Sequence, residues 1–329
     1  MLQRGSNLAE WLLDEGIGEH RAALVEGDII LEAAIDRLDD RLRLGAVVTA
    51  KLGERVGGGA WLSTPQGDAI LEAVPRGLSQ GRSLLVEIVR EAIPEPGRLK
   101  PPRARASDAE AEHPAPTLAE RLQGAPIRRL SPHEPDRLEQ VGWSELLEQA
   151  ETGEIDFPGG ALRLSPTPAM ALFDIDGTLP AADLALAGGR AAAEAIRRLA
   201  IGGSIGLDLP TLGSKAERAA AAAMIDATLP PPFERTAVNG FGFMQIIRPR
   251  PRASIPELVR SDPALTAVLR LLRVGAHGHG ARRLVAAPPV IARLEARPDW
   301  IEALARMTGG TVSLRADPGL AISAGHVEP

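Results

Sequence analysis

Between residues 160 and 250, short apolar runs alternate with Ala-rich segments, and this alternation constrains the fold more than any other feature of the sequence. GALRLS and AMALFDID are typical of paired strands, and SIGLDLP and FGFMQIIR of two more. The Ala-rich segments 183–200 and 214–228 have helical composition, with Ser214 as a suitable N-cap for the second. Strands that alternate with helices predict an α/β layer.

The rest of the 329-residue chain is long enough for additional compact units. Short apolar runs in 45–92, separated by Gly, Pro and Asp, predict a small β-barrel, whereas 94–116 contains six prolines and few large apolar residues. We expect five parts: N-terminal strands of the core at 1–44, a barrel at 45–98, a mobile Pro-rich linker at 99–116, an α/β core at 117–260, and a small α+β C-terminal domain at 261–329.

Composition narrows the classes of function. The chain has no cysteine, which excludes disulfides, thiolate zinc sites and a catalytic cysteine. No run of eighteen apolar residues and no signal-peptide pattern is present, so we expect a cytoplasmic protein without a membrane segment. The net charge of −6 argues against a general polyanion binder, but residues 241–329 carry 12 Arg against 7 acidic residues, so local nucleic-acid binding is compatible with the sequence.

The sharpest motif is Phe173-Asp174-Ile175-Asp176-Gly177-Thr178, which follows an apolar approach. Residues two apart on a strand point to the same side, so Asp174 and Asp176 are expected to lie side by side, where a divalent cation would relieve their repulsion. Asp208 ends another apolar strand, and ligands collect at strand ends in α/β sheets. These three carboxylates are therefore the candidate magnesium ligands and catalytic residues.

Two other interpretations of these residues stay open. Asp176-Gly177 can be an ordinary turn, with Asp208 only closing a strand. FDIDGTL is also the nucleophile motif of the haloacid-dehalogenase-like phosphatases, in which the first aspartate attacks phosphorus. That chemistry needs a downstream lysine and an acidic pair, and Lys215 is the only lysine after Lys100.

In order along its length, the chain resembles a shortened member of the ribonuclease E/G family. GIGEHRAALVEGD is similar to the family's opening strands, and GAVVTAKL through LLVEIVREAIPEPGRLK to its inserted oligonucleotide-binding (OB) barrel. The segment GWSELLEQAETGEIDFPGGALRLSPTPAMALFDID resembles the lead-in to the catalytic strand, and LAGGRAAAEAIRRLAIGGSIGLDLP the segment with the second catalytic aspartate. FGFMQIIRPR and the sequence from RRLVAAPPV to RADP resemble the last core strand and the small C-terminal domain.

The resemblance implies an α/β catalytic core with an inserted OB-like barrel, and a magnesium-dependent endoribonuclease acting on single-stranded RNA. Asp174 and Asp208 fall on the family's two metal-binding aspartates, and Asp176 falls where the family usually has asparagine. That substitution leaves open a second class of function, an RNA-binding protein that has lost catalysis. Without cysteine, the zinc link between subunits of the longer relatives is not expected, although an oligomer is compatible with the sequence; the segment that senses the RNA 5′ end is also missing.

Several residues are candidate RNA contacts. Trp61, on the expected barrel, either stacks on a base or belongs to the core. Arg248 and Arg250 alternate on one strand and are expected to clamp phosphate beside the carboxylates. The remaining candidates are basic residues of the barrel region that either contact phosphate or form an ordinary solvated face, namely Lys51, Arg76, Arg82 and Lys100. His277 and His279, set among glycines, are expected to form a loop and not a metal site.

Overall fold

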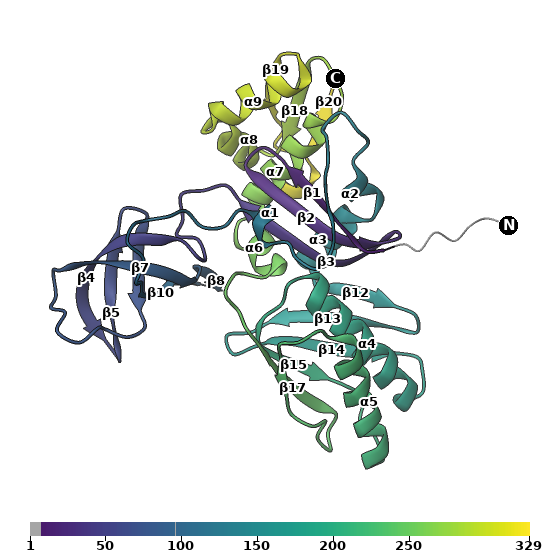
Figure 1. Cartoon of the computed structure of the whole chain (residues 1–329). Helices are drawn as coiled ribbons and strands as arrows, with labels where there is room; N and C mark the ends of the chain where they lie inside the picture. The colour runs from purple at the N-terminus through teal and green to yellow at the C-terminus, as the bar shows by residue number, and fades with distance from the viewer. Residues whose placement is uncertain (1–7, 96) are drawn as a thin grey trace. The chain divides into compact units, whose positions relative to one another are not determined.

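The computed structural model describes residues 8–95 and 97–329. The chain divides into two compact units, each assembled from separate segments (Figure 1). The first unit combines residues 1–39, 122–147 and 259–329, and the second combines 40–121 and 148–258. Every helix in the described part of the chain is too short or too polar to cross a membrane.

A closed five-stranded barrel forms one part of the second unit (Figure 1). Its interior is lined by small and branched apolar side chains at alternate positions, such as Ala60 and Leu62, as expected when one face of each strand is buried. The closed order is β10-β6-β5-β4-β7. The strands are β4 (Val47–Val56), β5 (Gly59–Thr64), β6 (Gly67–Leu71), β7 (Ser83–Arg90) and β10 (Arg103–Ala106).

The prediction of a mobile linker at 99–116 is wrong for the first part of that segment. Strands β8 (Ile93–Glu95) and β9 (Arg98–Lys100) form a hairpin, and β10 closes the barrel between β6 and β7. In the run Arg-Ala-Arg-Ala that forms β10, Ala104 is fully buried while the arginines on either side are exposed. This two-residue alternation is a strand pattern, which the proline content of the segment concealed. The short helix α1 (Leu118–Arg121) follows.

The other part of the second unit is a six-stranded sheet with the order β12-β13-β14-β15-β17-β16. Helices α4 and α5 pack against each other, and α4 packs on β12, β13 and β14. The Ala and Gly composition of α4 permits a close approach, since a Cβ on Gly188 would lie 2.3 Å from Cγ2 of Ile175. The elements are β12 (Glu154–Phe157), β13 (Gly160–Pro166), β14 (Ala171–Gly177), α4 (Ala181–Arg198), β15 (Gly203–Asp208), α5 (Lys215–Thr228), β16 (Glu234–Arg235) and β17 (Phe243–Arg248).

The two faces of this sheet differ in burial. One face carries apolar side chains that are almost fully buried, including Phe173, Ile205 and Ile246. The alternate residues on the opposite face, which we call the open face, are half-buried or exposed apart from Gly206, and they include all three candidate aspartates. The sheet therefore buries one face as a core and leaves the other accessible.

The first unit joins the two ends of the chain. One sheet has the order β11-β1-β2-β3 and another the order β19-β18-β20. Trp300 and the helices of the C-terminal segment share a core with Ile17 of the β1–β2 turn. The strands are β1 (Glu10–Glu15), β2 (Glu19–Glu26), β3 (Ile29–Arg37), β11 (Ile127–Arg129), β18 (Arg282–Ala286), β19 (Val312–Ala316) and β20 (His326–Glu328). The helices are α2 (Arg137–Gln140), α7 (Pro263–Ala276), α8 (Pro288–Glu295), α9 (Pro298–Thr308) and a 3-10 turn (Ile322–Ala324), while α3 (Trp143–Thr152) and α6 (Ile255–Ser261) bridge the sequence boundaries between the units.

This division differs from the domains expected from the sequence. The N-terminal strands do not belong to the sheet that carries the aspartates, because they pair with β11 and share a core with the C-terminal helices. The mixed α/β character and the inserted barrel agree with expectation. The packing of β1–β3 with α7 depends on contacts between residues more than 200 positions apart, which local sequence patterns do not report.

Candidate functional site

Asp174 and Asp208 lie opposite each other on neighbouring parallel strands. Strand β14 pairs with β15 so that Asp174 is in register with Asp208. Parallel strands end at the same sheet edge, and residues in register lie on the same face. The two carboxylates are therefore neighbours on the open face, with Asp174 in the middle of β14 and Asp208 at the carboxyl end of β15.

Asp176 follows on the same face of β14, two residues beyond Asp174, and is exposed. Glycines fix the backbone here: a Cβ on Gly160 would lie 2.4 Å from the carbonyl oxygen of Asp176, and one on Gly177 would lie 2.4 Å from that of Gly159. Only glycine allows β13 and β14 to approach this closely. The Gly159-Gly160 pair thus determines where Asp176 sits.

The carboxylates influence one another electrostatically. Burial raises the pKa of Asp174 above its ordinary value, and the charges of Asp176 and Asp208 raise it further. Arg163 acts in the opposite direction. Among the described residues, three carboxylates thus act on one another here against the opposing charge of Arg163, a condition that a divalent cation would relieve.

Arg163 belongs to the site, although the sequence analysis did not select it. It pairs in register with Asp174 on one side and with Glu154 on the other, and its Nε lies 2.9 Å from Oε1 of Glu154. The hydrogen bond that Arg163 donates to Glu154 and the charges of Glu154, Asp174 and Asp176 raise the pKa of Arg163. Alternation along GALRLS would have placed Arg163 on the polar side of β13, which was the available signal.

The donor set fits a hard divalent cation, because all the charged oxygens at this strand end are carboxylates. Among the residues that the structure describes, however, no group of three or more His, Cys, Asp or Glu side chains is gathered closely enough to form a complete cage. Magnesium is commonly held by one or two carboxylates, with water and substrate phosphate supplying the remaining ligands. The Asp174–Asp208 pair fits that second kind of site.

Arg248 and Arg250 do not lie beside the carboxylates, so the sequence-based expectation of a phosphate clamp is wrong. Strand β17 is antiparallel to β15, which places Phe243 opposite Asp208 and Arg248 opposite Gly203. A Cβ on Gly203 would lie 3.0 Å from Cδ of Arg250. Five residues of strand correspond to roughly 17 Å, so both arginines lie at the far end of the sheet.

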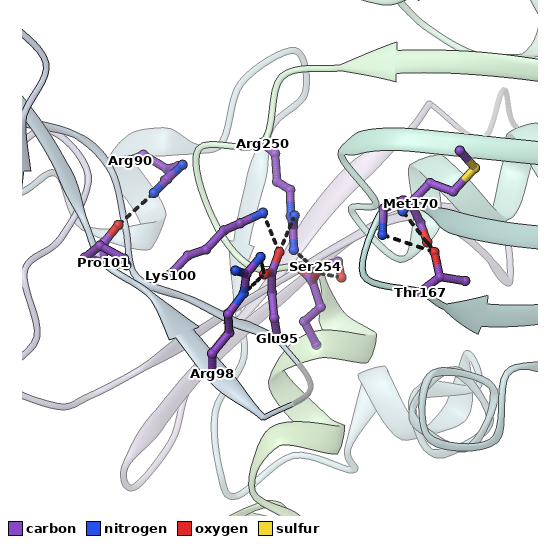
Figure 2. Close-up of polar contacts among 11 residues, drawn as sticks. Arg90, Glu95, Arg98, Lys100, Pro101, Thr167, Met170, Arg250 and Ser254 are labelled. Carbon is purple, nitrogen blue, oxygen red and sulfur yellow. Dashed lines mark hydrogen bonds and ion pairs between the residues drawn. The ribbon is translucent and has the colours of Figure 1, made fainter. Parts of the chain in front are cut away.

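Arg250 instead belongs to a cluster of ion pairs around Glu95 (Figure 2). Its Nη1 lies 3.5 Å from Oε1 of Glu95, and it also pairs with Glu257. Lys100 and Arg98 approach the same carboxylate at 2.5 Å and 2.8 Å. These contacts join the β8–β9 hairpin to the segment after β17, and give Lys100 and Arg250 structural partners.

The candidate RNA contacts on the barrel are accessible. The side chain of Trp61 is 39% exposed on the outer surface, while its neighbours Ala60 and Leu62 are fully buried inside. The alternative of a core tryptophan is therefore wrong. Lys51 on β4, and Arg76 and Arg82 in the β6–β7 connection, are also exposed.

The histidine-containing loop lies in the first unit and packs against acidic and basic residues. Nε2 of His277 lies 3.3 Å from Oδ2 of Asp136, which also accepts a hydrogen bond of 2.6 Å from Nη2 of Arg21. The rings of His133 and His279 stack with their centroids 5.4 Å apart. A cavity of about 30 Å³, lined in part by Arg21 and His277, adjoins these side chains. Its size suits one or two water molecules.

Compared with known proteins, the sequence matches no family model and no curated protein. The assignment of a function therefore depends on the geometry of the site and on the resemblance in its motifs.

Proposed function

We propose that this protein is a magnesium-dependent endoribonuclease that cleaves single-stranded RNA. The observation that carries the proposal is the register of Asp174, in the middle of β14, with Asp208, at the carboxyl end of the parallel strand β15. These are the two positions that resemble the metal-binding aspartates of the ribonuclease E/G family. The accessible face on which they lie gives an extended substrate room to approach.

The finer architecture follows the same proposal, with an α/β catalytic core, an inserted OB-like barrel and a small α+β C-terminal part. Numbered along the chain, the barrel strands occur in the order 1-2-3-5-4, and the fifth is parallel to the third. Five strands in a Greek-key order are what an OB barrel requires. Trp61 and Lys51 on its outer surface have the stacking and charge properties of a single-strand binding surface.

The catalytic roles follow from the positions of the side chains. Asp174 and Asp208 would hold Mg²⁺, which when bound polarises the scissile phosphate and lowers the pKa of a water. Asp176, exposed and next along the same face, would orient the attacking water. In-line displacement would leave a 3′-hydroxyl and a 5′-phosphate, as the resemblance implies.

Loss of catalysis with retained RNA binding is the second candidate function. It is favoured by Asp176, since the resembling family usually has an uncharged asparagine there. The phosphatase alternative has less support. Among the described strands of this sheet, β14 and β15 are the only parallel pair. The downstream lysine that the phosphatase chemistry needs could only be Lys215, which is an exposed residue at the start of α5.

Cleavage of a fluorogenic single-stranded RNA, measured with and without Mg²⁺, tests the proposal. We expect Asp174→Asn and Asp208→Asn to abolish cleavage, whereas Asp299→Asn, which changes an exposed aspartate of α9 in the first unit, leaves it unchanged. Unaltered cleavage by either folded variant of the pair would refute the assignment. RNA binding without cleavage by the wild type would favour the second candidate, and hydrolysis of p-nitrophenyl phosphate the phosphatase.

A further inference from the structure

An apolar patch adjoins the carboxylates on the open face. It is formed by Met170, Leu172 and Phe243, which converge over Gly206. A Cβ on Gly206 would lie 2.9 Å from Sδ of Met170, 2.9 Å from Cζ of Phe243 and 3.0 Å from Cδ1 of Leu172. The three side chains are only half-buried, so the patch remains accessible.

The patch is held in place by its backbone. Leu172 lies two residues before Asp174 on β14, and Phe243 pairs in register with Asp208. Met170 comes from the β13–β14 turn, where Thr167 donates its backbone N–H to the Met170 carbonyl at 2.9 Å and accepts the Met170 N–H at its hydroxyl oxygen at 3.0 Å (Figure 2). The patch and the carboxylates thus share one rigid surface.

A second aromatic stands at the same sheet edge. Phe241, in the β16–β17 connection, is 85% exposed. Its turn is ordered, because Oδ1 of Asn239 accepts the N–H groups of Phe241 and Phe243 at 2.9 Å and 3.0 Å. The Gly242 carbonyl accepts the N–H of Leu209, the residue after Asp208, at 3.2 Å.

Gly242 makes this arrangement possible. It has a positive φ of 92°, and a Cβ at this position would lie 2.1 Å from the Leu209 carbonyl oxygen. The turn is therefore pressed against the end of β15 that carries Asp208. The structure keeps a large apolar ring in solvent on an anchored turn, next to a charged site.

We propose that Phe241 and the Met170–Leu172–Phe243 patch form a platform for an unpaired nucleobase adjacent to the phosphate that is cleaved. This inference rests on the proposed function. The three carboxylates repel phosphate unless a metal cation intervenes, and the neighbouring Arg163 is already engaged by Glu154, so the uncharged part of a nucleotide is the part that this face can hold directly. Aromatic and apolar surfaces stack on any base, whereas a base within a duplex cannot reach them. The platform would therefore select single-stranded RNA without reading its sequence.

The test pairs changes in the protein with changes in the substrate. Single-turnover cleavage is measured with RNA that carries one abasic nucleotide, moved in turn across the positions that flank the cleaved bond. We expect the wild type to cleave about ten-fold more slowly when the abasic nucleotide occupies the platform position, which corresponds to about 1.4 kcal/mol. Phe241→Ala should cleave intact RNA about ten-fold more slowly but show little further loss with abasic RNA, whereas Phe241→Trp should restore the discrimination.

Two controls separate the possible failures. Ile29→Ala removes a 65%-exposed apolar side chain in the first unit and should change nothing, and melting temperatures verify that the Phe241 variants fold. Cleavage by Phe241→Ala equal to that of the wild type on every substrate would overturn the platform while the proposed function stands. If the wild type cleaves no RNA, the proposed function fails, and the platform is then tested by the fluorescence quenching of 2-aminopurine in bound RNA. Quenching by the wild type that is lost in Phe241→Ala would support the platform. The absence of quenching by the wild type would overturn it.

Discussion

At the scale of single residues, Asp174 is placed where its charge is unfavourable for folding. Burial and the neighbouring Asp176 and Asp208 raise its pKa. A carboxyl group whose folded-state pKa is raised stabilises the fold below its unfolded-state pKa, and this contribution is lost as the pH rises through the folded-state value. Sites that concentrate like charges commonly sacrifice stability for binding or catalysis.

Replacing Asp174 by asparagine should therefore stabilise the metal-free protein. We expect Asp174→Asn to raise the melting temperature in EDTA at neutral pH by a few degrees at most, with the gain disappearing below the usual pKa range of aspartate. Mg²⁺ should raise the melting temperature of the wild type and leave that of the variant unchanged. A lower melting temperature for Asp174→Asn in EDTA at neutral pH would contradict this account of the site.

A second prediction for a single side chain concerns RNA binding by Trp61 on the outer surface of the barrel. Because it is 39% exposed, Trp61→Ala should change the melting temperature little but weaken binding of single-stranded RNA about ten-fold or more, from a stacking contribution of about 1–3 kcal/mol. Leu62→Ala is the matched contrast, since Leu62 is fully buried and its truncation should cost about 2–5 kcal/mol of unfolding free energy. Fluorescence anisotropy should show weaker RNA binding for Trp61→Ala but not for Leu62→Ala.

At the scale of elements, closure of the barrel depends on the short strand β10. Ala104 is its fully buried residue, and it pairs with Leu71 of β6 and Ile88 of β7. Ala104→Asp would place a charge inside the barrel and should destabilise it by several kcal/mol. Arg105→Ala removes only an exposed ion pair with Glu87 and should cost less than about 1 kcal/mol. Equal denaturation midpoints for the two variants would show that β10 does not close the barrel.

Local sequence patterns predicted the helices and strands of the α/β layer but not how the strands pair. The strands and helices of the α/β layer were predictable because their periodicity and caps are local. Ser214, for example, is the N-cap of α5 as predicted, and the structure adds a capping box with Glu217. The pairing partners were not predictable. Arg248 was expected beside the carboxylates, alternating with Arg250 on one strand face. However, β17 is antiparallel to β15, so its beginning and not its end faces Asp208. Strand direction is determined by the whole sheet and leaves no local signal.

At the scale of the whole molecule, the first unit is held together by contacts between distant parts of the chain. Nη2 of Arg37 donates a buried hydrogen bond of 2.8 Å to Oγ1 of Thr266. Arg21, which is 2% exposed, bridges Asp14 and Asp136 at 2.7 Å and 2.6 Å. The N-terminal strands thus depend on the C-terminal helices, and the unit should unfold cooperatively.

His277 should make the stability of this unit depend on pH. Its hydrogen bond to Asp136 raises the pKa of the imidazole, opposed by burial. The stabilising contribution is therefore complete below the unfolded-state pKa of about 6.5 and is lost as the pH rises through the higher folded-state value. His277→Gln should lose up to about 1 kcal/mol of unfolding free energy at pH 5.5 and little at pH 9, measured by urea denaturation. A loss that is the same at both pH values would refute the ion pair.

The central claim is that Asp174 and Asp208 jointly hold a divalent cation. Anomalous scattering from crystals soaked in MnCl₂ tests this most directly, because manganese binds the same oxygen donors as magnesium and can be located without reference to activity. We predict a peak between the two carboxylates, at about 2.1 Å from an oxygen of each, which is absent in Asp174→Asn crystals. A peak at another carboxylate cluster, or none in the wild type, would contradict the account.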